Sequence, residues 1–171
     1  MKRLALLLSA LFGIIALTAA YTARVQAYAN DKSEITAVEQ RFLEGFKAKD
    51  VDKIMSCYVP DETLFVFDVV PPRQYVGAKA YRKDWEDLFA MYPGPLEAGM
   101  TDLNVTADRT LGYAHVIVHS VFTDRGGNKT ETNVRTTDVF RKTGGKWLIV
   151  HEHNSVPVDF ATGKADLMSK P

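Results

Sequence analysis

The sequence predicts an α+β fold in which helices pack on one face of a curved antiparallel sheet. Apolar residues recur at helical spacing in three segments of the first half of the chain, and the segments between residues 96 and 156 are strand-like. The strongest single signal is a long β-hairpin, because two runs rich in β-branched and aromatic residues flank Gly144 and Gly145. Helices followed by antiparallel strands are the order typical of α+β domains.

The N-terminal segment has the pattern of a secretory signal peptide. Lys2 and Arg3 precede an apolar run, and small residues surround Ala27, after which we expect cleavage. The protein is therefore expected to be periplasmic or secreted. The expected divisions of the chain are a signal peptide, residues 1–27; one folded domain, residues 28–158; and a polar, mobile C-terminal tail, residues 159–171.

Composition excludes several kinds of partner and site. The formal net charge is +0, which gives no basic footprint for nucleic acid or an anionic membrane. After the signal peptide, no apolar run is long enough to span a bilayer. Cys57 is the single cysteine, so an intramolecular disulfide and a cysteine-based metal site are excluded. We expect no nucleic-acid partner, no membrane partner after signal removal, and no cofactor.

The expected helices each have a start or a stop signal, and the strands are separated by turn residues. The helices are residues 31–49, with Asp31 or Ser33 as N-cap; residues 50–59, capped by Asp50 and ended by Pro60; and residues 77–92, beginning at Gly77 and ended by Pro93. The strands are residues 63–68, 96–107, 111–123, 134–142 and 146–156, with turns at residues 125–128 and 144–145.

The C-terminal hairpin carries polar residues that are unusual in a sheet. They include Asp138, His151, Glu152, His153 and Asn154. A carboxylate in a strand is disfavoured unless it faces water or lines a cavity, so we expect this hairpin to form one wall of a pocket.

Three stretches of the sequence resemble the SnoaL-like and ketosteroid isomerase-like branch of the nuclear transport factor two-like superfamily. They are residues 38–68, VEQRFLEGFKAKDVDKIMSCYVPDETLFVFD; residues 76–89, VGAKAYRKDWEDLF; and residues 136–157, TTDVFRKTGGKWLIVHEHNSVP. The resemblance implies a cone, in which a strongly bent sheet wraps around three helices and encloses an apolar pocket. The stretch WLIVHEHNS is also similar to the association domain of calcium/calmodulin-dependent kinase, another member of that superfamily.

The resemblance implies a pair of acids as catalytic residues. Asp68 matches the general base of ketosteroid isomerases, and Asp138 matches the protonated acid that stabilises the oxyanion. One departure is Phe42, which stands where those enzymes have an oxyanion-binding tyrosine, so any hydroxyl has to come from elsewhere. The expected substrate-binding residues are Asn154, His153, Tyr58, Trp85 and Phe42.

The register of the hairpin leaves the partner of Asp138 open. A two-residue turn at Gly144 and Gly145 places Asp138 opposite His151, which would make a plausible acid–base unit. The resemblance places Asn154 beside Asp138 instead. Both can hold only if a bulge or a longer turn shifts the register by one residue.

Other interpretations compete with these roles. Asp68 precedes a proline-containing turn, where aspartates cap backbone amides, and Trp85 fits the helix core. Asp138 could pair with Arg135 or Arg141 on the sheet surface. His151 and His153 share one face of their strand, as His115 and His119 do of theirs, but no metal-site spacing is matched and we expect no metal.

Two functions are consistent with the sequence. The first is an exported pocket protein that binds a small, apolar, oxygen-bearing molecule and acts as a cofactor-free isomerase or lyase on it, with Asp68, Asp138 and His151 as catalytic residues. The alternative is a non-catalytic ligand-binding or oligomerisation module like the kinase association domain. With either function we expect a homodimer, because residues 111–123 are apolar on both faces.

Overall fold

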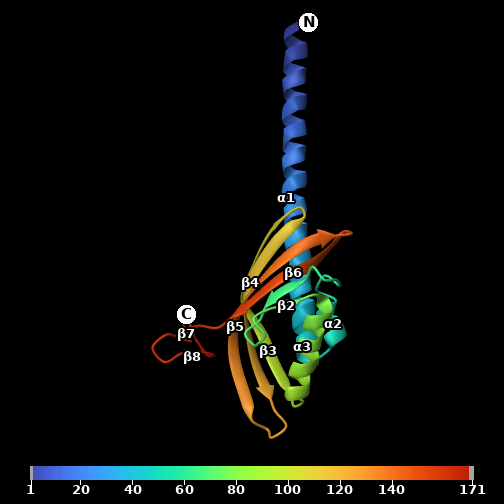
Figure 1. Ribbon diagram of the computed structural model, residues 1–171. Helices are drawn as coiled ribbons and strands as arrows, with labels where there is room; N and C mark the ends of the chain where they lie inside the picture. Colours follow the sequence, from blue (N-terminus) through green and yellow to red (C-terminus); the bar gives the residue numbers. More distant parts are fainter. Residues whose placement is uncertain (1, 170–171) are drawn as a thin grey trace.

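A curved six-stranded sheet packs against three helices. The first of them is long, and its N-terminal part projects from one end of this body (Figure 1). The computed structural model describes residues 2–169, with side chains from residue 17 onward. The helices are α1 (Lys2–Ala48), α2 (Val51–Met55) and α3 (Ala78–Met91). The strands are β1 (Phe65–Phe67), β2 (Tyr75–Val76), β3 (Leu96–Asp108), β4 (Leu111–Thr123), β5 (Lys129–Thr143), β6 (Lys146–Ser155), β7 (Val158–Asp159) and β8 (Lys164–Ala165).

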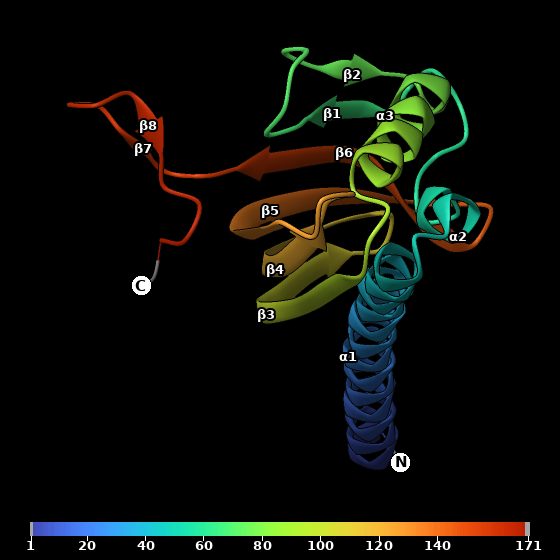
Figure 2. The same cartoon turned by 90° about the horizontal axis from the view of Figure 1, so that it is seen from below.

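The sheet order is β2-β1-β6-β5-β4-β3, and each neighbouring pair is antiparallel except β1 with β6. Seen along its strands, the sheet curls so that α3 and the C-terminal part of α1 lie on its concave side (Figure 2). This arrangement confirms the predicted α+β fold. A cavity lies between the sheet and α3, at the edge of the core.

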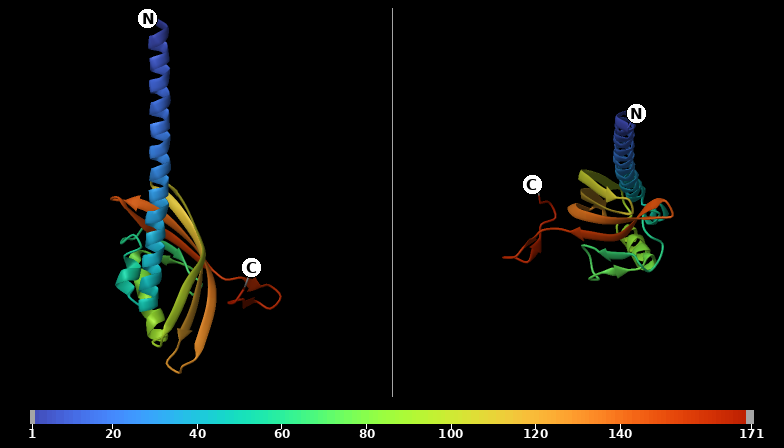
Figure 3. Two further views of the ribbon diagram at one scale, coloured as in Figure 1. Left: turned by 180° about the vertical axis from the view of Figure 1, so that it is seen from behind. Right: turned by 90° about the horizontal axis from the view of Figure 1, so that it is seen from above.

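Helix α1 begins much earlier than predicted. It runs from Lys2 to Ala48 without a break, so neither Asp31 nor Ser33 is an N-cap. Asp31 is instead buried, and its carboxylate accepts hydrogen bonds from Lys142 Nζ (2.8 Å) and Trp147 Nε1 (3.3 Å) of the C-terminal hairpin. Side chains 17–30 are all exposed, and the helix leaves the body there (Figure 3). Asp31 therefore marks where α1 joins the fold.

The remaining helices agree with the prediction. The side chain of Asp50 caps α2 by accepting from Lys53 N at 2.9 Å, although α2 ends at Met55. Helix α3 follows Gly77, whose φ of 86° is readily adopted only by glycine. Apolar side chains from all three helices meet those of the sheet in one core, which includes Ile35, Val38, Phe46, Ile54, Tyr81, Trp85, Val116, Phe140 and Ile149.

The C-terminal hairpin contains both the predicted turn and a bulge. Gly144 and Gly145 have φ values of 56° and 77°, and Thr143 pairs with Lys146. The register then shifts between Phe140, which pairs with Ile149, and Val139, which pairs with His151. Val150 is the extra residue. The predicted pairing of Asp138 with His151 is therefore wrong, because this one-residue shift places Glu152 opposite Asp138.

Two other segments differ from the prediction. Strand β2 was not expected, since two residues are too short to produce a period-2 pattern. The tail expected as a mobile extension contains the small β7–β8 sheet, and Asn133 N donates to the Leu167 carbonyl at 2.7 Å. This bond is possible because β6 ends at Ser155 while β5 continues to Lys129, which leaves part of the β5 edge open. Within the described part of the chain, no helix is long and apolar enough to cross a membrane.

The contact between α1 and β4 requires a glycine and gives a test of the core. A Cβ added at Gly112 would lie 2.6 Å from Ile35 Cδ1 and 2.9 Å from the Thr106 carbonyl oxygen. We predict that Gly112→Ala lowers the free energy of unfolding by about 1–3 kcal/mol in urea denaturation, because the Ile35 side chain and the backbone of β3 at Thr106 must move. The control is Gly99→Ala in β3, where a Cβ meets nothing within 4 Å. Equal stability of the two variants would contradict this packing.

Candidate functional site

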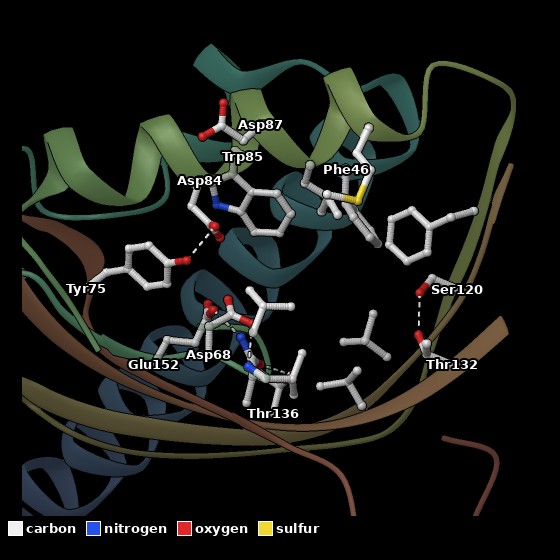
Figure 4. A pocket seen from close by; sticks show the side chains of 18 of the residues that line it. Phe46, Asp68, Tyr75, Asp84, Trp85, Asp87, Ser120, Thr132, Thr136 and Glu152 are labelled. Atoms are coloured by element: carbon white, nitrogen blue, oxygen red, sulfur yellow. Dashed lines mark hydrogen bonds between the residues drawn. The ribbon is translucent and has the colours of Figure 1, made fainter. Parts of the chain in front are cut away.

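A cavity of about 790 Å³ lies between the concave face of the sheet and α3. This volume is within the range of about 300–1,000 Å³ that is typical of small-molecule sites. Most of its wall is apolar, with Phe42 and Phe46 of α1, Trp85 of α3, and Val118 and Phe122 of β4. Two acids, Asp68 and Glu152, lie near each other below Trp85 at one end of the cavity, while the hydroxyls of Ser120 and Thr132 lie on another side (Figure 4).

Glu152 is the more heavily hydrogen-bonded of these two acids. Its residue is 2% exposed, and it points inward because the bulge at Val150 sets the face of β6. Oε2 accepts from the Tyr58 hydroxyl at 2.5 Å, and Oε1 accepts from the Tyr81 hydroxyl at 2.5 Å and from Asn154 Nδ2 at 2.7 Å. A buried carboxylate needs such donors to replace water.

Asp68 combines two roles that sequence reasoning treated as alternatives. Its Oδ1 accepts from Val69 N at 2.5 Å, as a turn cap does, while the side chain also lines the cavity. Its Oδ2 accepts from the Tyr81 hydroxyl at 3.2 Å. Burial, together with the nearby charge of Glu152, raises the pKa of Asp68 against the effect of these hydrogen bonds. One phenol therefore joins two cavity-lining carboxylates.

Asp138 lies behind Glu152 and does not line the cavity. It is 2% exposed, whereas Arg135 and Arg141 are exposed, and no ion pair among the described residues includes it. The surface ion pair considered above is thus wrong. Burial, then the charges of Glu39 and Glu152, raise the pKa of Asp138 well above its usual range. The raised pKa favours the neutral form of Asp138.

Glu39 of α1 completes a buried cluster of acids. It is 1% exposed, and burial, with a smaller contribution from the charge of Glu152, raises its pKa to about 7. One oxygen of Glu39 and one of Asp138 have no hydrogen-bond partner among the described groups. Two carboxyl groups shielded from water and close to the charge of Glu152 cannot both ionise cheaply, so Glu39 is mainly protonated below about pH 7.

The predicted histidines are on the other side of the sheet. His151 Nδ1 contacts the Phe65 carbonyl oxygen at 2.8 Å, and the rings of His153 and Phe67 have centroids 5.6 Å apart. Side chains alternate along a strand, and Glu152 and Asn154 point inward, so His151 and His153 point outward. Their predicted roles in the pocket are therefore wrong. In the described part of the chain, no three or more potential ligands are grouped to hold a metal ion.

The other predicted residues are in or beside the cavity. Phe42, Trp85 and Asn154 line it, while Tyr58 lies behind Glu152 as a donor. Trp85 is only 7% exposed, so it belongs to the core as well as to the wall, and its Nε1 has no hydrogen-bond partner among the described residues.

Sequence reasoning gave too little weight to Tyr81 and Glu152 and did not consider Glu39 or the pair of Tyr75 with Asp84. The Tyr75 hydroxyl donates to Asp84 Oδ1 at 2.6 Å, and burial raises the pKa of Asp84. The available signal for Glu152 was an acid between two histidines in an alternating strand. Its orientation, however, depends on the bulge.

The comparisons with known proteins agree with this fold. A family model described as SnoaL-like domain matches residues 35–159. An NTF2-like protein of unknown function from Pseudomonas putida KT2440 is 30% identical, with 84% of this chain and 98% of that chain covered and a TM-score of 0.75. No curated protein matches the sequence.

Two more distant structures are similar in fold alone. A ketosteroid isomerase-like protein from Erwinia carotovora atroseptica is 16% identical, covering 73% of this chain and 95% of that one, with a TM-score of 0.63. The association domain of C. elegans CaMKII is 20% identical, covering 75% and 98%, with a TM-score of 0.60. The cone-shaped fold implied by the sequence resemblance is thereby confirmed.

The protonated acids behind Glu152 predict an unusual dependence of stability on pH. Because the pKa of Glu39 is raised from 4.5 to about 7, the folded protein binds more protons than the unfolded chain between these values. The free energy of unfolding should therefore fall as pH rises through this interval, with a contribution from Glu39 on the order of 3 kcal/mol. Urea denaturation at a series of pH values measures this fall.

Glu39→Gln should flatten the profile, whereas Glu86→Gln, at an exposed position of α3, should leave it unchanged. A wild-type protein whose stability rises over the same interval would refute the assignment of protonated acids.

Proposed function

The chain belongs to the SnoaL-like domain family, and we propose that it binds an apolar small molecule in the cavity and catalyses cofactor-free proton transfer on it. The single observation that carries this proposal is the Tyr81 hydroxyl between Asp68 and Glu152 at one end of a mostly apolar cavity. A desolvated carboxylate with a raised pKa is a stronger base than one in water, and such groups concentrate at catalytic sites.

Asp68 is the proton acceptor in this proposal. Its carboxylate removes a proton from a carbon next to a carbonyl group of the substrate. The electron pair of the broken C–H bond forms a C=C bond to the carbonyl carbon, while the π pair of the C=O bond moves to the oxygen and gives an enolate. In a substrate with a C=C bond conjugated to this enolate, the C=O bond re-forms, the C=C bond shifts by one position, and the proton returns to the far carbon. This completes an isomerisation without an oxidant, a reductant or a second substrate. Asp68 holds the proton while the substrate rearranges, and its new O–H can donate to the Tyr81 hydroxyl oxygen, whose own hydrogen stays in the bond to Glu152.

The substrate oxygen requires a hydrogen-bond donor, which Phe42 lacks. The hydroxyls of Tyr58 and Tyr81 and the amide of Asn154 donate to Glu152. Trp85 Nε1 has no partner among the described residues, and the indole forms part of the cavity wall. We therefore assign the donor role to Trp85, in place of the tyrosine that Phe42 replaces and of Asp138, which is too deep to reach a ligand.

Export remains part of the proposal. Residues 17–30 contribute no buried side chain, and the first contact of α1 with the hairpin is made by Asp31. None of the described side chains of residues 17–27 belongs to the core or lines the cavity, which supports cleavage of a signal peptide after Ala27.

A homodimer through the convex face of the sheet is also proposed. Tyr113, Ile117 and Val121 of β4 and Val139 of β5 point to this face and are partly or fully exposed. We predict that the purified protein elutes as a dimer in size-exclusion chromatography with light scattering, and that Ile117→Lys shifts it to a monomer with unchanged circular dichroism. A wild-type monomer would overturn the dimer without affecting the proposed chemistry.

The role of Asp68 can be tested without knowing the product. Native mass spectrometry of the purified protein identifies any small molecule that co-purifies, and a panel of cyclic ketones serves otherwise. A base that removes a C–H proton exchanges it for deuterium in D₂O, which proton NMR detects. We predict that Asp68→Asn lowers the exchange rate at least about 100-fold, because general bases contribute about 10²–10⁴-fold.

The matched control is Asp108→Asn, which changes an exposed carboxylate at the end of β3. Exchange that continues unchanged in Asp68→Asn would remove Asp68 from the mechanism. No exchange by the wild-type protein, with binding retained, would favour the non-catalytic alternative.

A further inference from the structure

We propose that the ligand of this cavity is a cation, namely a protonated amine attached to an apolar ring system. This inference rests on the proposed function only in placing the ligand in the same cavity. It adds the chemical class of the polar group, which the family and the fold leave open.

The charges that line the cavity are the first argument. Four carboxylates contribute to its wall: Asp68, Asp84, Asp87 and Glu152. The lining cation is Lys83, and it bonds to Asp87, with both side chains more than half exposed. No ion pair among the described residues includes Asp68, Asp84 or Glu152. The cavity therefore has an excess of negative charge, and a positive group on the ligand would balance it.

The hydrogen-bond inventory is the second argument. The donors nearest the acids are used within the protein, since Tyr58, Tyr81 and Asn154 donate to Glu152 and Tyr75 donates to Asp84. Each carboxylate has about four lone-pair sites, so acceptor capacity remains on both acids. An ammonium group has three donors and no acceptor and fits such a site. A carboxylate or phosphate ligand would instead meet acceptors and like charge.

Aromatic side chains form part of the cavity wall, and one of them, Trp85, has an unpartnered N–H group among the described residues. Phe42, Phe46 and Trp85 form a contiguous cluster, with the Trp85 ring 5.7 Å from Phe42 and 5.6 Å from Phe46 between centroids. Aromatic faces attract organic cations while burying an apolar body. Trp85 is also 93% buried with an unpartnered Nε1, and Figure 4 shows this nitrogen on the side of the indole toward Asp84. An acceptor atom on the ligand, beside the amine, would satisfy this donor.

The experiment compares three probes that share one ring system and differ in charge: naphthylethylamine, naphthylethanol and naphthylacetate. Isothermal titration calorimetry with the full-length protein at neutral pH measures their dissociation constants. We expect the amine to bind at least about tenfold more tightly than the alcohol, and the carboxylate to bind more weakly than both.

Variants connect this preference to the acids of the cavity. Asp68→Asn and Asp84→Asn each remove one charge while keeping the side-chain shape, and each should reduce the preference for the amine over the alcohol several-fold. Two positions are used so that a folding defect in one leaves the other informative, and Asp108→Asn is the control outside the cavity.

Equal affinity for amine and alcohol, tighter binding of the carboxylate, or no binding of any probe at millimolar concentration would overturn the inference. Its failure is distinguishable from failure of the proposed function. Deuterium exchange into a neutral ketone that depends on Asp68, without a preference for the amine, supports the proposed function and rejects the cationic ligand. A preference for the amine without any deuterium exchange supports the cationic ligand and rejects the proposed proton-transfer function.

Discussion

A carboxylate buried between a sheet and two helices has to be surrounded by donors, and Glu152 meets this requirement with groups from three separate parts of the chain. Tyr58 follows α2, Tyr81 comes from α3, and Asn154 comes from the same strand two residues later. Glu152 therefore connects β6 to α3 and to the segment that follows α2. An unpaired carboxylate at this depth would cost several kcal/mol, which makes the arrangement cooperative.

The bulge in the hairpin is what makes this arrangement possible. With continuous pairing from the Gly144–Gly145 turn, the two histidines would face the helices and Glu152 would face outward. The extra residue, Val150, reverses the faces beyond it, so that His151 packs near Phe65 and Glu152 enters the interior. A single inserted residue thus decides which chemistry the cavity contains.

The concentration of acids has two consequences that act at different depths. Behind Glu152, Asp138 and Glu39 are shielded from water, and burial raises the pKa of both, which favours their neutral forms and limits the negative charge of the interior. In front of Glu152, Asp68 and Asp84 line the cavity. In our proposal a positively charged ligand balances the charge of these acids. The sequence resemblance implied that Asp68 and Asp138 both face the ligand. The structure differs, because Asp138 does not line the cavity and Glu152 does.

The sequence by itself determined the features that depend on neighbouring residues. Glycines 77, 144 and 145 have positive φ angles, Asp50 caps α2, and the apolar, β-branched run of residues 111–123 matches β4 from end to end. These are short-range effects of sterics and hydrogen bonding, and a single chain contains them. The resemblance to a known family added the cone and placed Asp68, Phe42, Trp85 and Asn154 at the cavity.

Only the tertiary structure decided which side chains meet. The bulge at Val150 leaves no periodic signal in the sequence, so the sequence did not show which residues of β6 face inward. His151 was therefore predicted in the pocket, and Glu152 was not. Asp31 looked like a helix cap because its partners, Lys142 and Trp147, are more than a hundred residues away. Contacts between distant segments depend on the whole packing arrangement, and this is why the candidate site could be located from the sequence but its chemistry could not.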